Sequence, residues 1–118
     1  MLFARLLTLQ ACGAALSLLP ALAGADRITQ MPAAERCAYK AKLSAAGYYY
    51  FLQGRQRHEI ALRWHGDETA GERQFVEHTL DEVYEAAAAE RREQPERAVS
   101  EQSFGDRVYQ TCMAGSRK

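Results

Sequence analysis

The fold of this protein is decided by residues 69–89, which read TAGERQFVEHTLDEVYEAAAA. One set of largely apolar side chains recurs here at gaps of one and three residues, which is the spacing of one face of an α-helix. The set is Phe75, Val76, Thr79, Leu80, Val83, Tyr84 and Ala87. Charged and polar residues fill most of the positions between them. We therefore expect an amphipathic helix over residues 70–92 with this set facing the core.

The start of this helix is marked by Thr69 and Glu72, which have the spacing of an S/T-x-x-E capping box. In such a box each side chain satisfies a free backbone N–H of the other residue. Asp67 and Glu68 precede it and favour the positive end of the helix dipole. Pro95 follows the charged end of the helix and breaks the pattern.

A second helix is expected over residues 32–53, because Pro32 suits a first turn and Gly54 suits the position just past a helix end. Its predicted inner face consists of Ala34, Cys37, Ala38, Ala41, Ala45, Tyr48, Tyr49 and Leu52. Lys40, Lys42 and Ser44 fall on other faces. Gly47 weakens this helix by about 1 kcal/mol relative to Ala, or allows a neighbouring element to approach closely.

A last helix is expected over residues 100–113, capped by Ser100. Its inner face would consist of Phe104, Val108, Tyr109 and Cys112, and residues 115–118 should fray.

Residues 55–65 fit two structures. Ile60, Leu62 and Trp64 alternate like a strand, but Ile60 and Trp64 also share a helical face with Ala61. Because a strand would have no partner elsewhere in the sequence, we expect a short helix. The predicted fold is thus all-α, a small bundle of three main helices plus one short helix.

Two cysteines, Cys37 and Cys112, lie on the predicted inner faces of the first and last helices. In an oxidising compartment such a pair forms a disulfide. Closing a loop of this length stabilises a fold by about 4 kcal/mol in the chain-entropy model. The sequence has no Cys-x-x-Cys pair, which argues against a catalytic thiol or a zinc site built on these cysteines.

The N-terminus has the layout of a secretory signal peptide over residues 1–25. Arg5 precedes an uncharged leucine-rich run, and small residues end it before Asp26. Two alternatives are a retained membrane anchor, which Pro20 and other residues interrupt, and lipid attachment at Cys12. Cleavage would leave residues 26–118 as a single helical domain, without a stable membrane anchor, in the periplasm or secreted.

The predicted mature chain carries 14 basic and 15 acidic residues, a net charge of −1. This balance lacks the basic surface that nucleic acids or anionic membranes attract, so no nucleic-acid partner is expected.

The main candidate for chemistry is the turn at residues 64–69, which holds Trp64, His65, Asp67 and Glu68. A functional interpretation uses His65 as an acid–base group or a metal ligand assisted by a carboxylate. The alternative is a turn that packs Trp64 on the core and caps the next helix. No catalytic, cofactor or metal motif is present, although His65, Asp67 and His78 could meet in space. We therefore expect no enzyme activity, no cofactor and no metal.

Tyr48-Tyr49-Tyr50-Phe51 places aromatic rings around most of a helix, so Tyr50 or Phe51 should point outward. Exposed aromatic side chains are typical anchors for protein partners. The alternative is that residues 55–65 cover them. Tyr50, Phe51, Trp64, His65, Asp67 and Glu68 are accordingly the candidate interaction residues.

The layout resembles a set of small exported helical proteins of Gram-negative bacteria. The resemblance lies in a Cys on the first helix, a Val-Tyr pair in mid-chain (Val83-Tyr84) and a closing Tyr-x-x-Cys (residues 109–112). It implies a periplasmic or secreted location and no particular activity. In size, location and single disulfide the chain is also similar to periplasmic acid-stress chaperones.

Together these features predict a non-enzymatic exported protein that binds or shields another protein. The identity of the partner and the oligomeric state stay open. The alternatives are an acid-stress chaperone, and a small enzyme or metal-binding protein that uses His65, Asp67 and Glu68.

Overall fold

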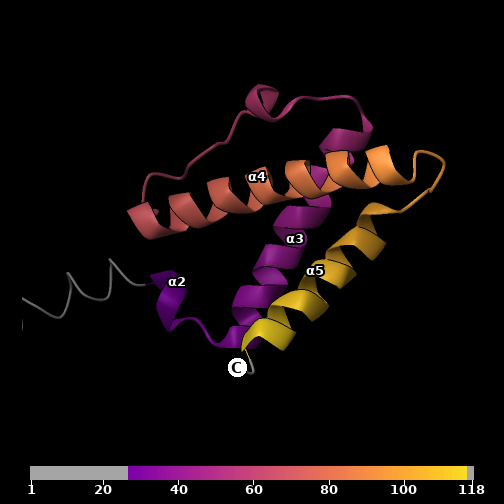
Figure 1. The fold of residues 1–118 in the computed structure, drawn as a ribbon. Helices are drawn as coiled ribbons and strands as arrows, with labels where there is room; N and C mark the ends of the chain where they lie inside the picture. Colours follow the sequence, from indigo (N-terminus) through magenta and orange to yellow (C-terminus); the bar gives the residue numbers. More distant parts are fainter. Residues whose placement is uncertain (1–26, 117–118) are drawn as a thin grey trace, which may run out of the picture.

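The structure, a computed structural model, describes residues 27–116. These residues form four α-helices and one 3₁₀ turn and contain no strand, so the predicted all-α fold is confirmed (Figure 1). In chain order the elements are α2 (Arg27–Gln30), α3 (Ala33–Leu52), η1 (Arg57–Glu59), α4 (Ala70–Glu93) and α5 (Glu101–Ser116).

The predicted signal peptide, with the anchor and lipid-attachment alternatives, lies outside the described residues. Of the helices within residues 27–116, none has the length and apolarity needed to cross a membrane.

Helix α3 lies at the centre of the bundle. Helix α5 runs antiparallel beside it, and α4 crosses it at a steep angle (Figure 1). Both helices pack on α3, whereas they make few contacts with each other. At the centre of the core, Tyr48 of α3, Val83 of α4 and Phe104 of α5 meet. The rings of Tyr48 and Phe104 are stacked with their centroids 4.3 Å apart.

The predicted inner face of α3 is partly wrong. Cys37 and Tyr48 are buried as expected, but Ser44 is buried too, while Tyr49 and Leu52 are exposed. The exposed positions also include Ala34 and Ala38. The reason is that α3 is contacted from two sides, which selects a stripe through positions 37, 44, 47 and 48.

The predicted inner face of α4 is confirmed, since five of its seven residues are buried and Phe75 and Tyr84 are half-buried. The capping box forms only in half. Thr69 Oγ1 accepts the Glu72 N–H at 3.1 Å, but the Glu72 carboxylate pairs with Arg27 at 3.0 Å. This ion pair links α2, which the sequence did not predict as a helix, to the start of α4.

The short helix predicted over residues 55–65 is wrong, because only one 3₁₀ turn forms and residues 60–65 are neither helix nor strand. Residues of this segment contact α4 instead. The Arg57 guanidinium pairs with Asp81 at 2.8 Å and Glu77 at 3.0 Å, and the Tyr84 hydroxyl donates to the Arg55 carbonyl. Half-buried and exposed residues alternate along residues 60–65, as in an extended chain lying on a surface.

Helix α5 begins where Ser100 predicts, because the Ser103 N–H donates to Ser100 Oγ at 3.1 Å. Fraying at positions 115 and 116 is not found, since α5 continues to Ser116, whose hydroxyl donates to the Met113 carbonyl at 2.8 Å. Residues 117–118 lie outside the described residues.

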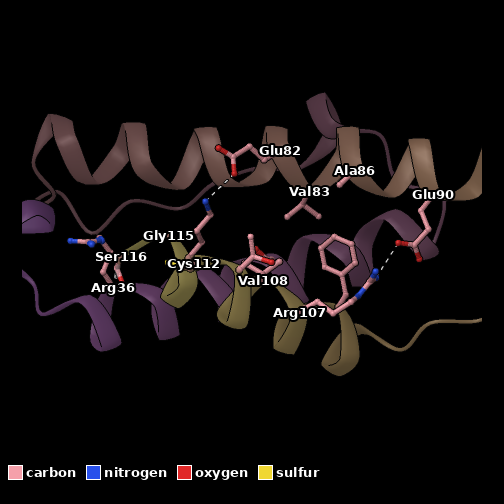
Figure 2. A pocket seen from close by; sticks show the side chains of 14 residues that line it. Arg36, Glu82, Val83, Ala86, Glu90, Arg107, Val108, Cys112, Gly115 and Ser116 are labelled. Atoms are coloured by element: carbon pink, nitrogen blue, oxygen red, sulfur yellow. Dashed lines mark hydrogen bonds and ion pairs between the residues drawn. The ribbon is translucent and has the colours of Figure 1, made fainter. Parts of the chain in front are cut away.

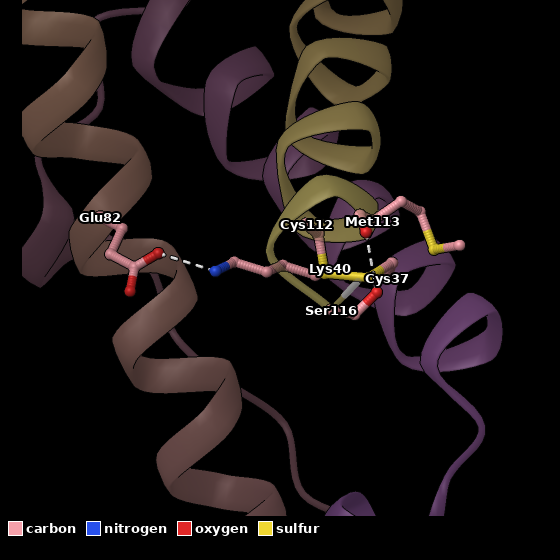
Figure 3. Close-up of a disulfide and its surroundings, with 6 residues drawn as sticks. All are labelled: Cys37, Lys40, Glu82, Cys112, Met113 and Ser116. Atoms are coloured by element: carbon pink, nitrogen blue, oxygen red, sulfur yellow. Dashed lines mark hydrogen bonds and ion pairs between the residues drawn. A yellow bond between two sulfur atoms is a disulfide. The ribbon is translucent and has the colours of Figure 1, made fainter. Parts of the chain in front are cut away.

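The predicted disulfide joins the first turns of α3 to the end of α5 (Figure 3). The Cys37 and Cys112 sulfur atoms are 2.07 Å apart, and the Cα atoms are 5.6 Å apart. Cys37 is fully buried.

Two glycines allow the helices to approach α3 closely. A Cβ on Gly47 would lie 2.9 Å from Leu80 Cδ2 and 3.3 Å from Val83 Cγ1 of α4. A Cβ on Gly105 of α5 would lie 3.0 Å from the backbone oxygen of Ala41. The close approach considered for Gly47 is therefore confirmed.

Removal of the disulfide should destabilise the fold strongly. We expect Cys37→Ala/Cys112→Ala to lower the free energy of unfolding by about 4 kcal/mol, because a long loop in the unfolded chain is no longer closed. Urea unfolding followed by circular dichroism measures this change. A loss below 1 kcal/mol would show that α5 is held by packing alone.

Adding a methyl group at Gly105 should also destabilise the fold. In Gly105→Ala the better helix propensity, about 1 kcal/mol, is outweighed by overpacking against the backbone oxygen of Ala41, 3.0 Å from the added Cβ, because backbone cannot turn aside as a side chain can. The control is Gly115→Ala, where the added methyl group has no heavy atom within 4 Å. The helix–helix contact is refuted if both variants melt at or above the wild-type temperature.

Candidate functional site

The structure places the predicted interaction residues in two regions. Tyr50 and Phe51 lie in the last turn of α3, whereas residues 64–68 form the turn that leads into α4. No contact between the two groups is found among the described residues, so they do not form one site.

The end of α3 carries an exposed patch of large apolar side chains. The exposed fractions are 43% for Tyr49, 38% for Tyr50 and 43% for Leu52. The rings of Tyr49 and Tyr50 meet edge to face at 5.7 Å. We call these three residues the α3 patch. The segment at residues 55–65 does not cover it, because that segment is attached to α4.

Phe51 is half-buried and has a structural role. Its ring stacks at 6.2 Å from Tyr48 and contacts Tyr84 edge to face at 5.5 Å. The Arg91 guanidinium lies 4.6 Å from its centroid, a cation–π contact that covers another side of the ring. Phe51 thus joins the end of α3 to α4 and does not belong to the α3 patch.

The turn at residues 64–68 is organised by one carboxylate. Glu68 accepts the backbone N–H of His65 at 2.6 Å and that of Gly66 at 2.8 Å. These hydrogen bonds, with that from His65 first, hold the pKa of Glu68 below its ordinary value. Gly66 has a φ of +103°, a conformation that side-chain-bearing residues rarely adopt. Both oxygens of the Glu68 carboxylate therefore accept hydrogen bonds from backbone N–H groups.

The other candidates of this turn do not converge on a cavity. His65 and Asp67 are exposed. Trp64 is half-buried, and the Arg73 guanidinium lies 5.3 Å from its ring centroid. Within residues 27–116 no group of three His, Cys, Asp or Glu side chains is placed to hold a metal ion. The geometry thus fits a structural turn.

A groove that the sequence did not predict lies between α4 and α5, with α3 as its floor (Figure 2). Its volume is about 670 Å³. Val83 and Ala86 of α4 face Phe104 and Val108 of α5, and Ser44 of α3 contributes to the floor. The groove exists because both outer helices pack on α3 and hardly on each other.

Charged side chains lie on either side of the apolar stretch of the groove. Lys40 pairs with Glu82 at 3.0 Å, and Arg107 pairs with Glu90 at 3.0 Å (Figure 2). Arg36 also lines the groove and makes no ion pair with another described residue. The sequence pattern did not indicate this site, because Lys40 and Ser44 lie outside the predicted inner face of this helix.

Comparison of the chain with protein-family models, with curated proteins and with solved structures found no match.

The hydrogen bonds of Glu68 give a testable pH dependence. Folding favours the ionised carboxylate, so its stabilising contribution is present above the pKa of the unfolded chain and is lost as the pH falls through the lowered pKa of the folded chain. By NMR, the carboxyl carbon of Glu68 and the amides of His65 and Gly66 should titrate together, with a midpoint below 4.5.

Two variants check this assignment. Glu68→Gln should abolish the titration of both amides, whereas Glu85→Gln, an exposed position on α4, should leave it intact. A Glu68 midpoint at or above 4.5 would contradict the clamped turn.

Proposed function

We propose that this is a non-enzymatic exported protein that binds another protein through the α3 patch. The observation that carries the proposal is the exposure of Tyr49, Tyr50 and Leu52 within four residues of one helix end. Exposed tyrosine side chains are typical anchors in protein interfaces.

The chemistry of the patch supports a protein partner. Tyrosine is enriched in interfaces because it buries a large apolar ring at a low cost in conformational entropy and offers a hydroxyl for hydrogen bonding. Tyr48, the residue directly before Tyr49 and Tyr50, is anchored in the core by stacking on the ring of Phe104. The patch is therefore presented by a rigid support, so little order has to be gained on binding.

The disulfide supports the export part of the proposal. Disulfides persist in oxidising compartments and are rare in the cytosol. The Cys37–Cys112 bond is compatible with the periplasm or the extracellular medium. This argument agrees with the export signal predicted from residues 1–25 and with the resemblance to small exported helical proteins of Gram-negative bacteria.

The experiment is site-specific photo-cross-linking in intact cells that export the protein. A photoreactive phenylalanine analogue replaces Tyr50 in one strain and Gln110, an exposed position on α5, in the control strain. We expect one discrete adduct from position 50 only. Its loss in the background Tyr49→Ser/Leu52→Ser would assign the contact to the α3 patch, because these exposed residues contribute little to the core.

Three other outcomes have distinct meanings. An adduct of twice the mass of the chain would identify a second copy as the partner. Adducts with many proteins that form only at about pH 3 would favour an acid-stress chaperone. The same adducts from positions 50 and 110, or none from either, would refute binding through the α3 patch.

A further inference from the structure

The buried hydroxyl of Ser44 is an unexplained feature of the groove. Ser44 is 1% exposed, and its Oγ has no hydrogen-bond partner among the described residues. A buried hydroxyl without a partner destabilises a fold, and alanine would avoid this cost. Alanine occupies position 45 next to it and position 41 one turn earlier. Ser44 also lines the groove, so its hydroxyl is a hydrogen-bond donor at this site that no other described residue uses.

The charge next to Ser44 is positive. Lys40 lies one turn earlier on the same face of α3, and both residues line the groove. The partner of Lys40 is Glu82, whose side chain is 62% exposed, so the pair is weak and water can solvate Glu82 when the ammonium moves. Arg36, another turn earlier, adds a second cation at this end. This end of the groove thus suits an anion.

The middle of the groove is apolar, and its length is limited. Val83, Ala86, Phe104 and Val108 line it, and an ion pair to α4 lies on either side of this apolar stretch (Figure 2). The two α4 partners are Glu82 and Glu90, which are about 12 Å apart along the helix axis. A helix laid in the groove would have to break both pairs, whereas a small molecule fits between them. The volume is in the usual range for small-ligand sites.

We propose that this groove binds a small amphiphilic carboxylate. The carboxylate accepts hydrogen bonds from the Ser44 hydroxyl and the Lys40 ammonium, and the apolar body lies between Val83 and Phe104. Ser44 lines the groove but is only 1% exposed, so the proposal requires a neighbouring side chain to move aside on binding. This site is separate from the α3 patch, so the proposal does not depend on the proposed protein partner.

The test uses decanoate and the oxidised protein in isothermal titration calorimetry, below the concentration at which decanoate self-associates. The matched probe is decyltrimethylammonium, which has the same alkyl chain and the opposite charge. We expect saturable binding of one decanoate per chain and at least tenfold weaker binding of the cation. Absence of saturable decanoate binding, or equal affinity for the two amphiphiles, would overturn the proposal.

Variants separate a binding role of Ser44 from a structural one. Ser44→Ala should weaken decanoate binding about tenfold, the effect of losing a hydrogen bond to a charged group, while raising the melting temperature. Unchanged affinity with a raised melting temperature would show that the hydroxyl serves no ligand.

Filling the groove tests its location. Ala86→Leu, at an exposed position on the α4 wall, should also weaken binding. Ala46→Leu, at an exposed position of α3 that does not line this groove, is the control and should not. Equal loss in both variants, or in neither, would place decanoate elsewhere. Tyr50→Ser should leave decanoate binding unchanged even if it abolishes the protein adduct.

Discussion

The contact between α3 and α5 is the constraint on which the rest of the structure depends. Helix α5 packs mainly on α3, and the bond between Cys37 and Cys112 fixes that pairing at one end. Near the other end the stacked rings of Tyr48 and Phe104 align the two helices. Between these points two glycines allow close packing. Gly105 lets α5 approach the backbone of α3, and Gly47 lets α4 approach α3.

Both candidate surfaces follow from the central position of α3. A helix flanked by two partners that hardly touch leaves a gap above it, which is the groove. The last turn of the same helix exposes Tyr49 and Tyr50, which form most of the α3 patch. One surface exposes two tyrosines and a leucine, and the other is a groove whose apolar stretch lies between charged side chains. The position of α3 thus gives rise to both candidate surfaces among the described residues.

Much of the fold could be predicted from the sequence because α4 alternates apolar and charged residues cleanly. Its observed start at Ala70 agrees with the cap predicted at Thr69. The buried face of α3 was harder to predict, because alanines occur on every face of this helix and because the buried Ser44 is a polar residue. The segment at residues 55–65 was mispredicted because its structure depends on Arg57 reaching Glu77 and Asp81, a contact distant in sequence.

The candidate sites were less predictable than the fold. Tyr50 could be named from its position in a run of aromatics, but the exposure of Tyr49 depends on where the neighbouring segment lies. The groove has no local signature at all, because its lining comes from three helices whose crossing angles the sequence pattern does not specify. The turn at Glu68 is the opposite case. Its residue types suggested an acid–base or metal-binding role, but the Glu68 carboxylate accepts hydrogen bonds from the backbone N–H groups of His65 and Gly66.

The unequal burial of the two cysteines has a consequence for redox chemistry. Cys37 is fully buried, whereas Cys112 is half-buried. Cys112 is therefore the more accessible residue for an attacking thiolate, and exchange there releases the Cys37 thiolate inside the fold. Burial disfavours that thiolate, which makes Cys37 a poor leaving group. The folded protein should therefore exchange thiols slowly, and its oxidation state should be set when it folds rather than by later changes in the surrounding thiol pool.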